Sequence, residues 1–122
     1  MIRTIIVDDE LLAGVGIQSL IHGKEDIDVA GVFNSAEEAL DYLRENIVDI
    51  VVTDIEMGDM SGLELIRVIR NDHLADGVII LSCHDDFSYA QEAISQGTDS
   101  YLLKHSITEK LLIQQTVSQC KS

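Results

Sequence analysis

The sequence has no proline, only two cysteines and few cations for its length. Cys83 and Cys120 are too few for a disulfide framework, so we expect free thiols and a cytoplasmic location. No apolar run approaches the roughly 20 residues that a membrane-spanning helix needs. The start of the chain also lacks the cleavage pattern of a signal peptide. We therefore expect no membrane partner.

The shortage of cations gives the chain a strong negative charge. Eight Lys and Arg residues face 22 Asp and Glu residues, which leaves a formal net charge of −14. A surface this acidic repels nucleic-acid phosphates and anionic lipids. The chain itself is thus a poor candidate for binding DNA or membranes, whereas a divalent cation or a partner with a basic face suits it.

Length and composition indicate one folded domain. The chain has 122 residues, of which 46% are hydrophobic and 25% charged, as in ordinary globular domains. No Gly/Ser-rich linker or internal repeat divides it. We expect residues 1–122 to form a single domain, with any output domain outside this chain.

Five short apolar runs are predicted to be strands. They are continuously apolar or β-branched for the most part, which is typical of strands buried on both faces in a parallel sheet. The runs are Thr4–Val7, Val29–Phe33, Ile50–Thr53, Val78–Leu81 and Tyr101–Leu103.

Helical patterns fill the gaps between these strands. Capping boxes begin at Ser35 and at Ser61, each followed by an apolar stripe. Further helices are predicted at about 11–21, around 87–94 with a stop at Gly97, and from Ser106. This β-α alternation predicts an α/β fold: a flavodoxin-like, doubly wound, five-stranded parallel sheet of order 2-1-3-4-5 with helices on both faces.

Polar residues follow four of the predicted strands. Asp8-Asp9-Glu10 follows the first, Asp54 the third, Ser82 the fourth and Lys104 the fifth. In this fold ligands bind at the carboxyl ends of the strands, so we expect these side chains to converge. Carboxylates this close repel unless a cation lies among them, and hard oxygen ligands suit Mg²⁺. The alternative is a solvated acidic loop.

Asp54 is the central candidate, because it follows a rigid apolar strand. A carboxylate there can attack phosphorus and form an acyl phosphate, or can serve only as a metal ligand. A hydroxyl such as Ser82 and an ammonium such as Lys104 can bind phosphoryl oxygens.

These residues resemble the receiver domain of bacterial two-component response regulators. The resemblance covers essentially the whole chain. The matching segments are Ile5–Glu10, Asp54–Met57 with Met60–Glu64, Ile80–Ser82 and Asp99–Lys104.

The resemblance implies a role for each site residue. Asp54 accepts a phosphoryl group from a sensor histidine kinase, while Asp8, Asp9, Asp54 and the main-chain carbonyl of Glu56 hold Mg²⁺. Lys104 and Ser82 bind the phosphoryl group, and Ser82 with Tyr101 forms the switch. For Tyr101, a half-buried core tyrosine is the alternative.

The resemblance also implies how the signal leaves the domain. Such a switch catalyses only its own phosphorylation and dephosphorylation. Its fourth helix, fifth strand and fifth helix form a face that often pairs two receivers. The segment His84–Ala90 resembles receivers attached to AraC-like helix-turn-helix domains, which implies transcription regulation through an output domain. DNA would be bound only by that output domain.

Two positions depart from the family pattern. His105 stands where a proline usually follows the lysine through a cis bond, and Gly58 replaces a second usual proline. A cis bond without proline costs about 2.5–4 kcal/mol, so we predict a trans Lys104–His105 bond.

Three other functions remain open. A degenerate receiver would act only as a protein-interaction module. An Mg²⁺-dependent phosphatase of the haloacid-dehalogenase type would need its nucleophile after the first strand and a second Asp two residues on, but Glu10 follows Asp8 at that spacing. A flavodoxin-like FMN module would need a phosphate loop where Asp8-Asp9-Glu10 repels phosphate.

Overall fold

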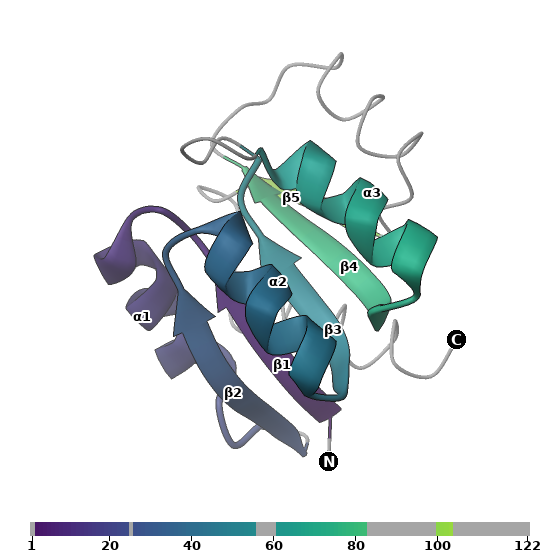
Figure 1. Ribbon diagram of the computed structural model, residues 1–122. Coiled ribbons are helices and arrows are strands. Elements are labelled where there is room, and N and C mark those ends of the chain that lie inside the picture. The colour runs from purple at the N-terminus through teal and green to yellow at the C-terminus, as the bar shows by residue number, and fades with distance from the viewer. Residues whose placement is uncertain (1, 25, 56–60, 83–99, 104–122) are drawn as a thin grey trace.

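The protein is described from a computed structural model, which covers residues 2–24, 26–55, 61–82 and 100–103 (Figure 1). The elements in chain order are β1 (Ile2–Val7), α1 (Leu11–Ile21), β2 (Ile27–Phe33), α2 (Ala36–Glu45), β3 (Val48–Thr53), α3 (Gly62–Asp72), β4 (Ala75–Ser82) and β5 (Ser100–Leu103). The helices predicted around 87–94 and from Ser106 lie outside the described residues, as do Glu56, Gly58, Lys104 and His105.

The strands form one parallel sheet in the order β2-β1-β3-β4-β5. This confirms the predicted fold class and strand order. Strands β1, β2, β3 and β4 begin two or three residues before the predicted runs, and β5 begins one residue before its run. One irregularity lies between β1 and β2: Thr4 pairs with Val29 but Ile5 pairs with Gly31, so Ala30 is an extra residue in β2.

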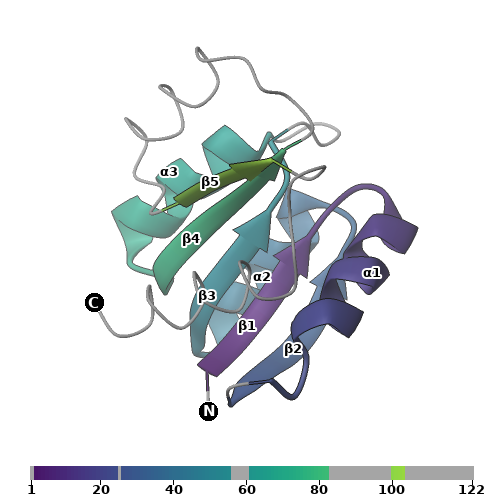
Figure 2. The ribbon, with the colours of Figure 1, turned by 180° about the vertical axis from the view of Figure 1, so that it is seen from behind.

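Helices cover both faces of the sheet. Figure 1 shows α2 and α3 on one face, and Figure 2 shows α1 on the other. Alternate residues of β1 point to opposite faces: Ile5 and Val7 pack in a core with α2 and α3, whereas Ile6 packs in a second core with Ile17 of α1. A strand that is buried on both sides is apolar at most of its positions, which explains the nearly continuous apolar runs.

The predicted capping residues begin two helices. The Ser35 hydroxyl accepts the main-chain N–H of Glu38, and the Ser61 hydroxyl accepts that of Glu64, each at 3.2 Å. Each bond satisfies an N–H that has no partner within its own helix. The helices therefore begin where the capping boxes indicate. Among the helices in the described ranges, none has the length and apolar character needed to cross a bilayer.

Candidate functional site

Asp8 and Asp54 lie side by side because of the strand order. Strands β1 and β3 are parallel neighbours, and their last residues, Val7 and Thr53, pair with each other. The next residue in each chain segment is the aspartate. The main-chain N–H of Asp54 donates to the carbonyl of Val7 at 3.0 Å, which extends this pairing past the strand ends. The predicted convergence of these two acids is confirmed.

Asp9 completes a cluster of three carboxylates. One oxygen from each of Asp8, Asp9 and Asp54 lies within 4.8 Å of the others. Asp8 is 1% exposed and Asp54 is 9% exposed, whereas Asp9 is exposed to solvent. The carboxylates of Asp8 and Asp54 are thus shielded from water, whereas Asp9 lies at the open, solvent-facing side of the cluster.

Main-chain donors fix the orientation of the two buried carboxylates. Oδ1 of Asp8 accepts the N–H of Glu10 at 2.9 Å, and Oδ1 of Asp54 accepts the N–H of Ile55 at 2.7 Å. Each bond runs to the backbone within two residues of its own aspartate, so it restricts rotation of that side chain. The Thr53 hydroxyl also donates to the main-chain carbonyl of Asp54 at 3.0 Å. The orientations of the Asp8 and Asp54 carboxylates are therefore fixed before a ligand binds.

The start of α3 packs directly against the backbone of Asp54. The N–H of Gly62 donates to the carbonyl of Ile55 at 2.6 Å. A Cβ added at Gly62 would overlap the carbonyl oxygen of Asp54. Only a residue without a side chain allows this approach. Sequence reasoning used Gly62 as part of a capping box and missed this role. The signal available was a glycine at the first position of a helix that begins a few residues after Asp54.

The three carboxylates fit a magnesium ion. Their oxygens are hard ligands, and an exposed Asp9 leaves room for the waters that Mg²⁺ usually keeps. Three negative charges in a partly buried cluster repel one another, and a divalent cation offsets that repulsion. The donor set and its charge thus agree with the expected metal.

Two of the remaining predicted site residues, Ser82 and Tyr101, belong to the neighbouring strands β4 and β5. Ser82 is the last residue of β4 and pairs with Leu103 of β5, and Tyr101 pairs with Ile80. The backbones of β4 and β5 therefore end at the same edge of the sheet as β3. The side chains of Ser82 and Tyr101, and all of Glu56 and Lys104, lie outside the part of the chain that is described.

Comparisons with known proteins all identify the same family. A sequence profile of the response regulator receiver domain matches residues 4–116. The transcriptional regulatory protein BtsR of Salmonella typhimurium is 35% identical over 112 residues, which is 92% of this chain and 45% of BtsR. The chain spans about half the length of the curated relatives it matches.

Solved structures share the fold. The receiver domain of AraT from Geobacillus stearothermophilus is 33% identical, with a TM-score of 0.84 over 99% of this chain and 95% of that one. The receiver domain of a response regulator NarL from Mycobacterium tuberculosis has a TM-score of 0.92 over 99% of this chain and 97% of that one. Its identity is 22%, so that match concerns the fold alone.

Proposed function

The chain belongs to the response regulator receiver family, whose members are phosphorylation-dependent signalling switches, and from that premise we propose that Asp54 is its phosphoacceptor. The donor is the phosphohistidine of a sensor histidine kinase. One observation carries the assignment. Of the three clustered carboxylates, Asp54 alone follows the central strand β3 and has its carboxylate held by the N–H of the very next residue; like Asp8, it is largely buried.

The transfer is a displacement at phosphorus. A carboxylate oxygen of Asp54 forms a bond to phosphorus as the bond between phosphorus and the histidine nitrogen breaks. The electron pair of the broken bond stays on the imidazole, which takes up a proton from water. The product is an acyl phosphate on Asp54 and a neutral histidine on the kinase. Hydrolysis of the acyl phosphate returns the carboxylate and releases inorganic phosphate.

Asp8, Asp9 and Asp54 would hold Mg²⁺, together with the main-chain carbonyl of Glu56. When bound, this ion supplies positive charge that offsets the charge of the phosphoryl oxygens. The fixed orientation of the Asp8 carboxylate supports its assignment as a ligand. Asp9, at the open side, is suited to contact the ion through a bound water as well as directly.

Ser82 and Lys104 would bind the transferred phosphoryl group. The hydroxyl donates a hydrogen bond to one phosphoryl oxygen, and the ammonium pairs with another. We propose that Ser82 and Tyr101 together form the switch, since both belong to the adjacent strands β4 and β5. Phosphorylation adds about −1.5 to −2 charge, and the arrangement that satisfies the new oxygens gains population.

We further propose how the domain is used. Residues 1–122 act as one domain in the cytoplasm, and the domain catalyses only its own phosphorylation and dephosphorylation. Relatives of about twice the length are named transcriptional regulators, which supports an output in transcription regulation. DNA binding belongs to that output domain. An AraC-like output and pairing through the fourth helix, β5 and the fifth helix stay predictions.

Intact mass tests the phosphoacceptor. The chain is incubated with acetyl phosphate, with and without Mg²⁺, beside Asp54→Asn and the matched control Asp49→Asn from the other end of β3. We expect one added phosphoryl group on the wild type and on Asp49→Asn, only with Mg²⁺. An adduct on Asp54→Asn would refute the assignment. If no adduct accumulates on the wild type, a beryllofluoride titration separates fast hydrolysis, which leaves binding intact, from a degenerate receiver, which does not bind.

A further inference from the structure

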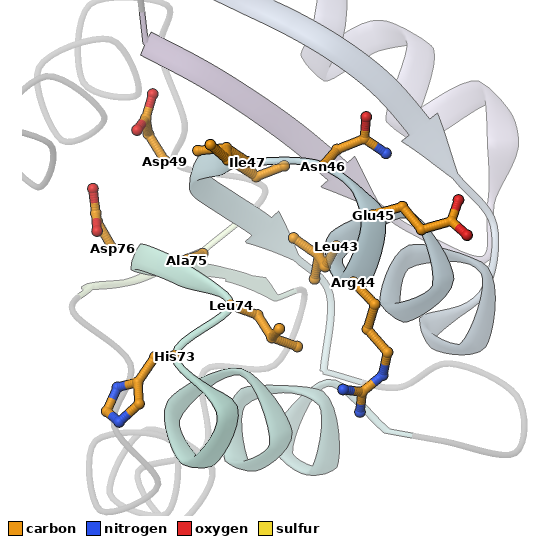
Figure 3. Close-up of a pocket in the computed structure, with 11 residues that line it drawn as sticks. Leu43, Arg44, Glu45, Asn46, Ile47, Asp49, His73, Leu74, Ala75 and Asp76 are labelled. Carbon is orange, nitrogen blue, oxygen red and sulfur yellow. The ribbon is translucent and has the colours of Figure 1, made fainter.

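A surface hollow lies at the end of the sheet opposite the three aspartates. It is lined by the end of α2, the start of β3, the residues that follow α3 and the start of β4 (Figure 3). Its volume is about 380 Å³, within the range of about 300–1,000 Å³ that ligand pockets occupy. No role proposed above for phosphoryl transfer uses these residues.

The middle of the hollow is apolar. Leu43 and Leu74 point toward each other there, from the end of α2 and from the segment between α3 and β4 (Figure 3). Leu43 is buried and Leu74 is half-buried. Ile47 lies on the margin and is 80% exposed, so a large aliphatic side chain faces solvent beside an apolar depression. An apolar group seated in the hollow would remove both surfaces from water.

The margin of the hollow is acidic. The pairing of Val48 with Ala75 and of Ile50 with Gly77 aligns Asp49 with Asp76 across β3 and β4. Figure 3 shows both carboxylates on the same side of the hollow. Like charges directly opposite each other on neighbouring strands are destabilising.

The groups around this pair leave the margin negative. Asp49 accepts one hydrogen bond at 2.8 Å, from the uncharged main-chain N–H of Arg3. Glu45 adds a third carboxylate on another side of the hollow. The guanidinium of Arg44, also on the margin, is held by Asp72 of α3 at 3.1 Å. The guanidinium of Arg70 donates to the main-chain carbonyl of Asp76 at 3.2 Å, so one cation of the chain lies near the pair. Three carboxylates, those of Asp49, Asp76 and Glu45, still line the margin, and a further cation from outside would offset their repulsion.

We propose that this hollow is a docking site for a basic protein segment that carries an aliphatic side chain between lysines or arginines. The aliphatic side chain would contact Leu74 and cover Ile47, while a cation next to it would pair with Asp49 and Asp76. The same acids, on a chain of net charge −14, repel nucleic acids and anionic lipid surfaces, which leaves a cationic protein as the complementary partner. The site is independent of the phosphoacceptor.

A peptide titration of the ¹⁵N-labelled chain tests the proposal. The probe is an amidated ten-residue peptide with two central leucines flanked on each side by lysines. We expect saturable shifts of the amide signals of Ile47, Leu74 and Ala75. A peptide with serines in place of the leucines should bind at least fivefold more weakly. A peptide with glutamates in place of the lysines should give no shifts.

Variants of exposed residues locate the binding. Ile47→Ser and Asp76→Asn should each weaken the dissociation constant at least fivefold. Two matched controls, Leu12→Ser on α1, where Leu12 is 87% exposed, and Asp41→Asn on the exposed side of α2, should change it less than twofold. The proposal is overturned if the shifts centre on Asp8 and Asp9, if the controls weaken binding as much as the test variants, or if no saturable shift occurs.

Discussion

The substitution Gly62→Ala should both lower the stability of the protein and slow the phosphorylation of Asp54. The added Cβ would overlap the carbonyl oxygen of Asp54 and lie 2.9 Å from both the carbonyl carbon of Asp54 and the Cα of Ile55. These are backbone atoms at the end of a buried central strand, so they cannot rotate away as the tip of a side chain can. Either α3 or the segment that carries Asp54 must move.

The magnitude follows from two opposing terms. Overpacking a buried site costs about 1–3 kcal/mol. In a helix interior, alanine in place of glycine raises the free energy of unfolding by about 0.5–1 kcal/mol. Gly62 lies at a helix start, so only part of this gain is expected there. We therefore expect a net loss of about 1–2 kcal/mol in the free energy of unfolding. A displacement of Asp54 by about 1 Å would also slow its phosphorylation by up to about 100-fold.

Gly16→Ala is the matched control for this prediction. Gly16 lies inside α1, and a Cβ there would meet no atom within 4 Å. The same substitution should therefore stabilise the protein by about 0.5–1 kcal/mol. Because the chain has no tryptophan, unfolding in urea is followed by circular dichroism. If both variants gain stability, or if both lose it equally, the steric reasoning about Gly62 is refuted.

Three further predictions concern helix ends and the metal. Ser35→Ala and Ser61→Ala should each lower the free energy of unfolding in urea by about 1 kcal/mol, since each removes the acceptor of a main-chain N–H. His73→Gly should raise it by up to about 1 kcal/mol, because His73 ends α3 at a φ of 54° that glycine adopts without a steric cost. Asp9→Asn should weaken Mg²⁺ binding at least about tenfold in calorimetry, with an unchanged circular dichroism spectrum because Asp9 is exposed.

Each of these has a control in the same chain. Ser19→Ala, on the exposed surface of α1, should change stability by less than about 0.5 kcal/mol, and an equal loss there would remove the capping explanation. His73→Ala keeps the Cβ, so a gain equal to that of His73→Gly would contradict the backbone argument. Asp41→Asn removes one charge far from the cluster, and equal weakening of Mg²⁺ binding would point to general electrostatics.

The fold was predictable where burial dictates the residue type. Ile5 and Ile6 face opposite cores, so both must be apolar, and this double requirement makes the run stand out in the sequence. The capping roles of Ser35 and Ser61 were equally predictable, because a capping bond joins residues only three apart in the chain.

Strand starts were less predictable. β4 begins at Ala75, and its next two residues, Asp76 and Gly77, have low strand propensity. They are held in the sheet by pairing with β3, where Val48 pairs with Ala75 and Ile50 pairs with Gly77. That pairing is a tertiary interaction, and no local sequence pattern at the start of β4 predicts it.

Some features of the site were likewise predictable from the sequence and others were not. The convergence of Asp8 and Asp54 follows from strand order, which the sequence predicts through its β-α alternation. The close approach of Gly62 to the carbonyl of Asp54 depends on how the start of α3 packs against the end of β3. The acidic hollow combines residues from the ends of four elements, and its alignment of Asp49 with Asp76 depends on the register of β3 against β4. Composition and spacing do not encode such distances.

Direct identification of the modified residue tests whether Asp54 is the phosphoacceptor. The chain is phosphorylated with acetyl phosphate and Mg²⁺ and then treated with sodium borohydride, which reduces an acyl phosphate on aspartate to homoserine. Tandem mass spectrometry of the peptides then locates homoserine. We predict homoserine at position 54 and at no other aspartate. Homoserine at position 8 or 9, with Asp54 unmodified, would show that Asp54 is not the phosphoacceptor.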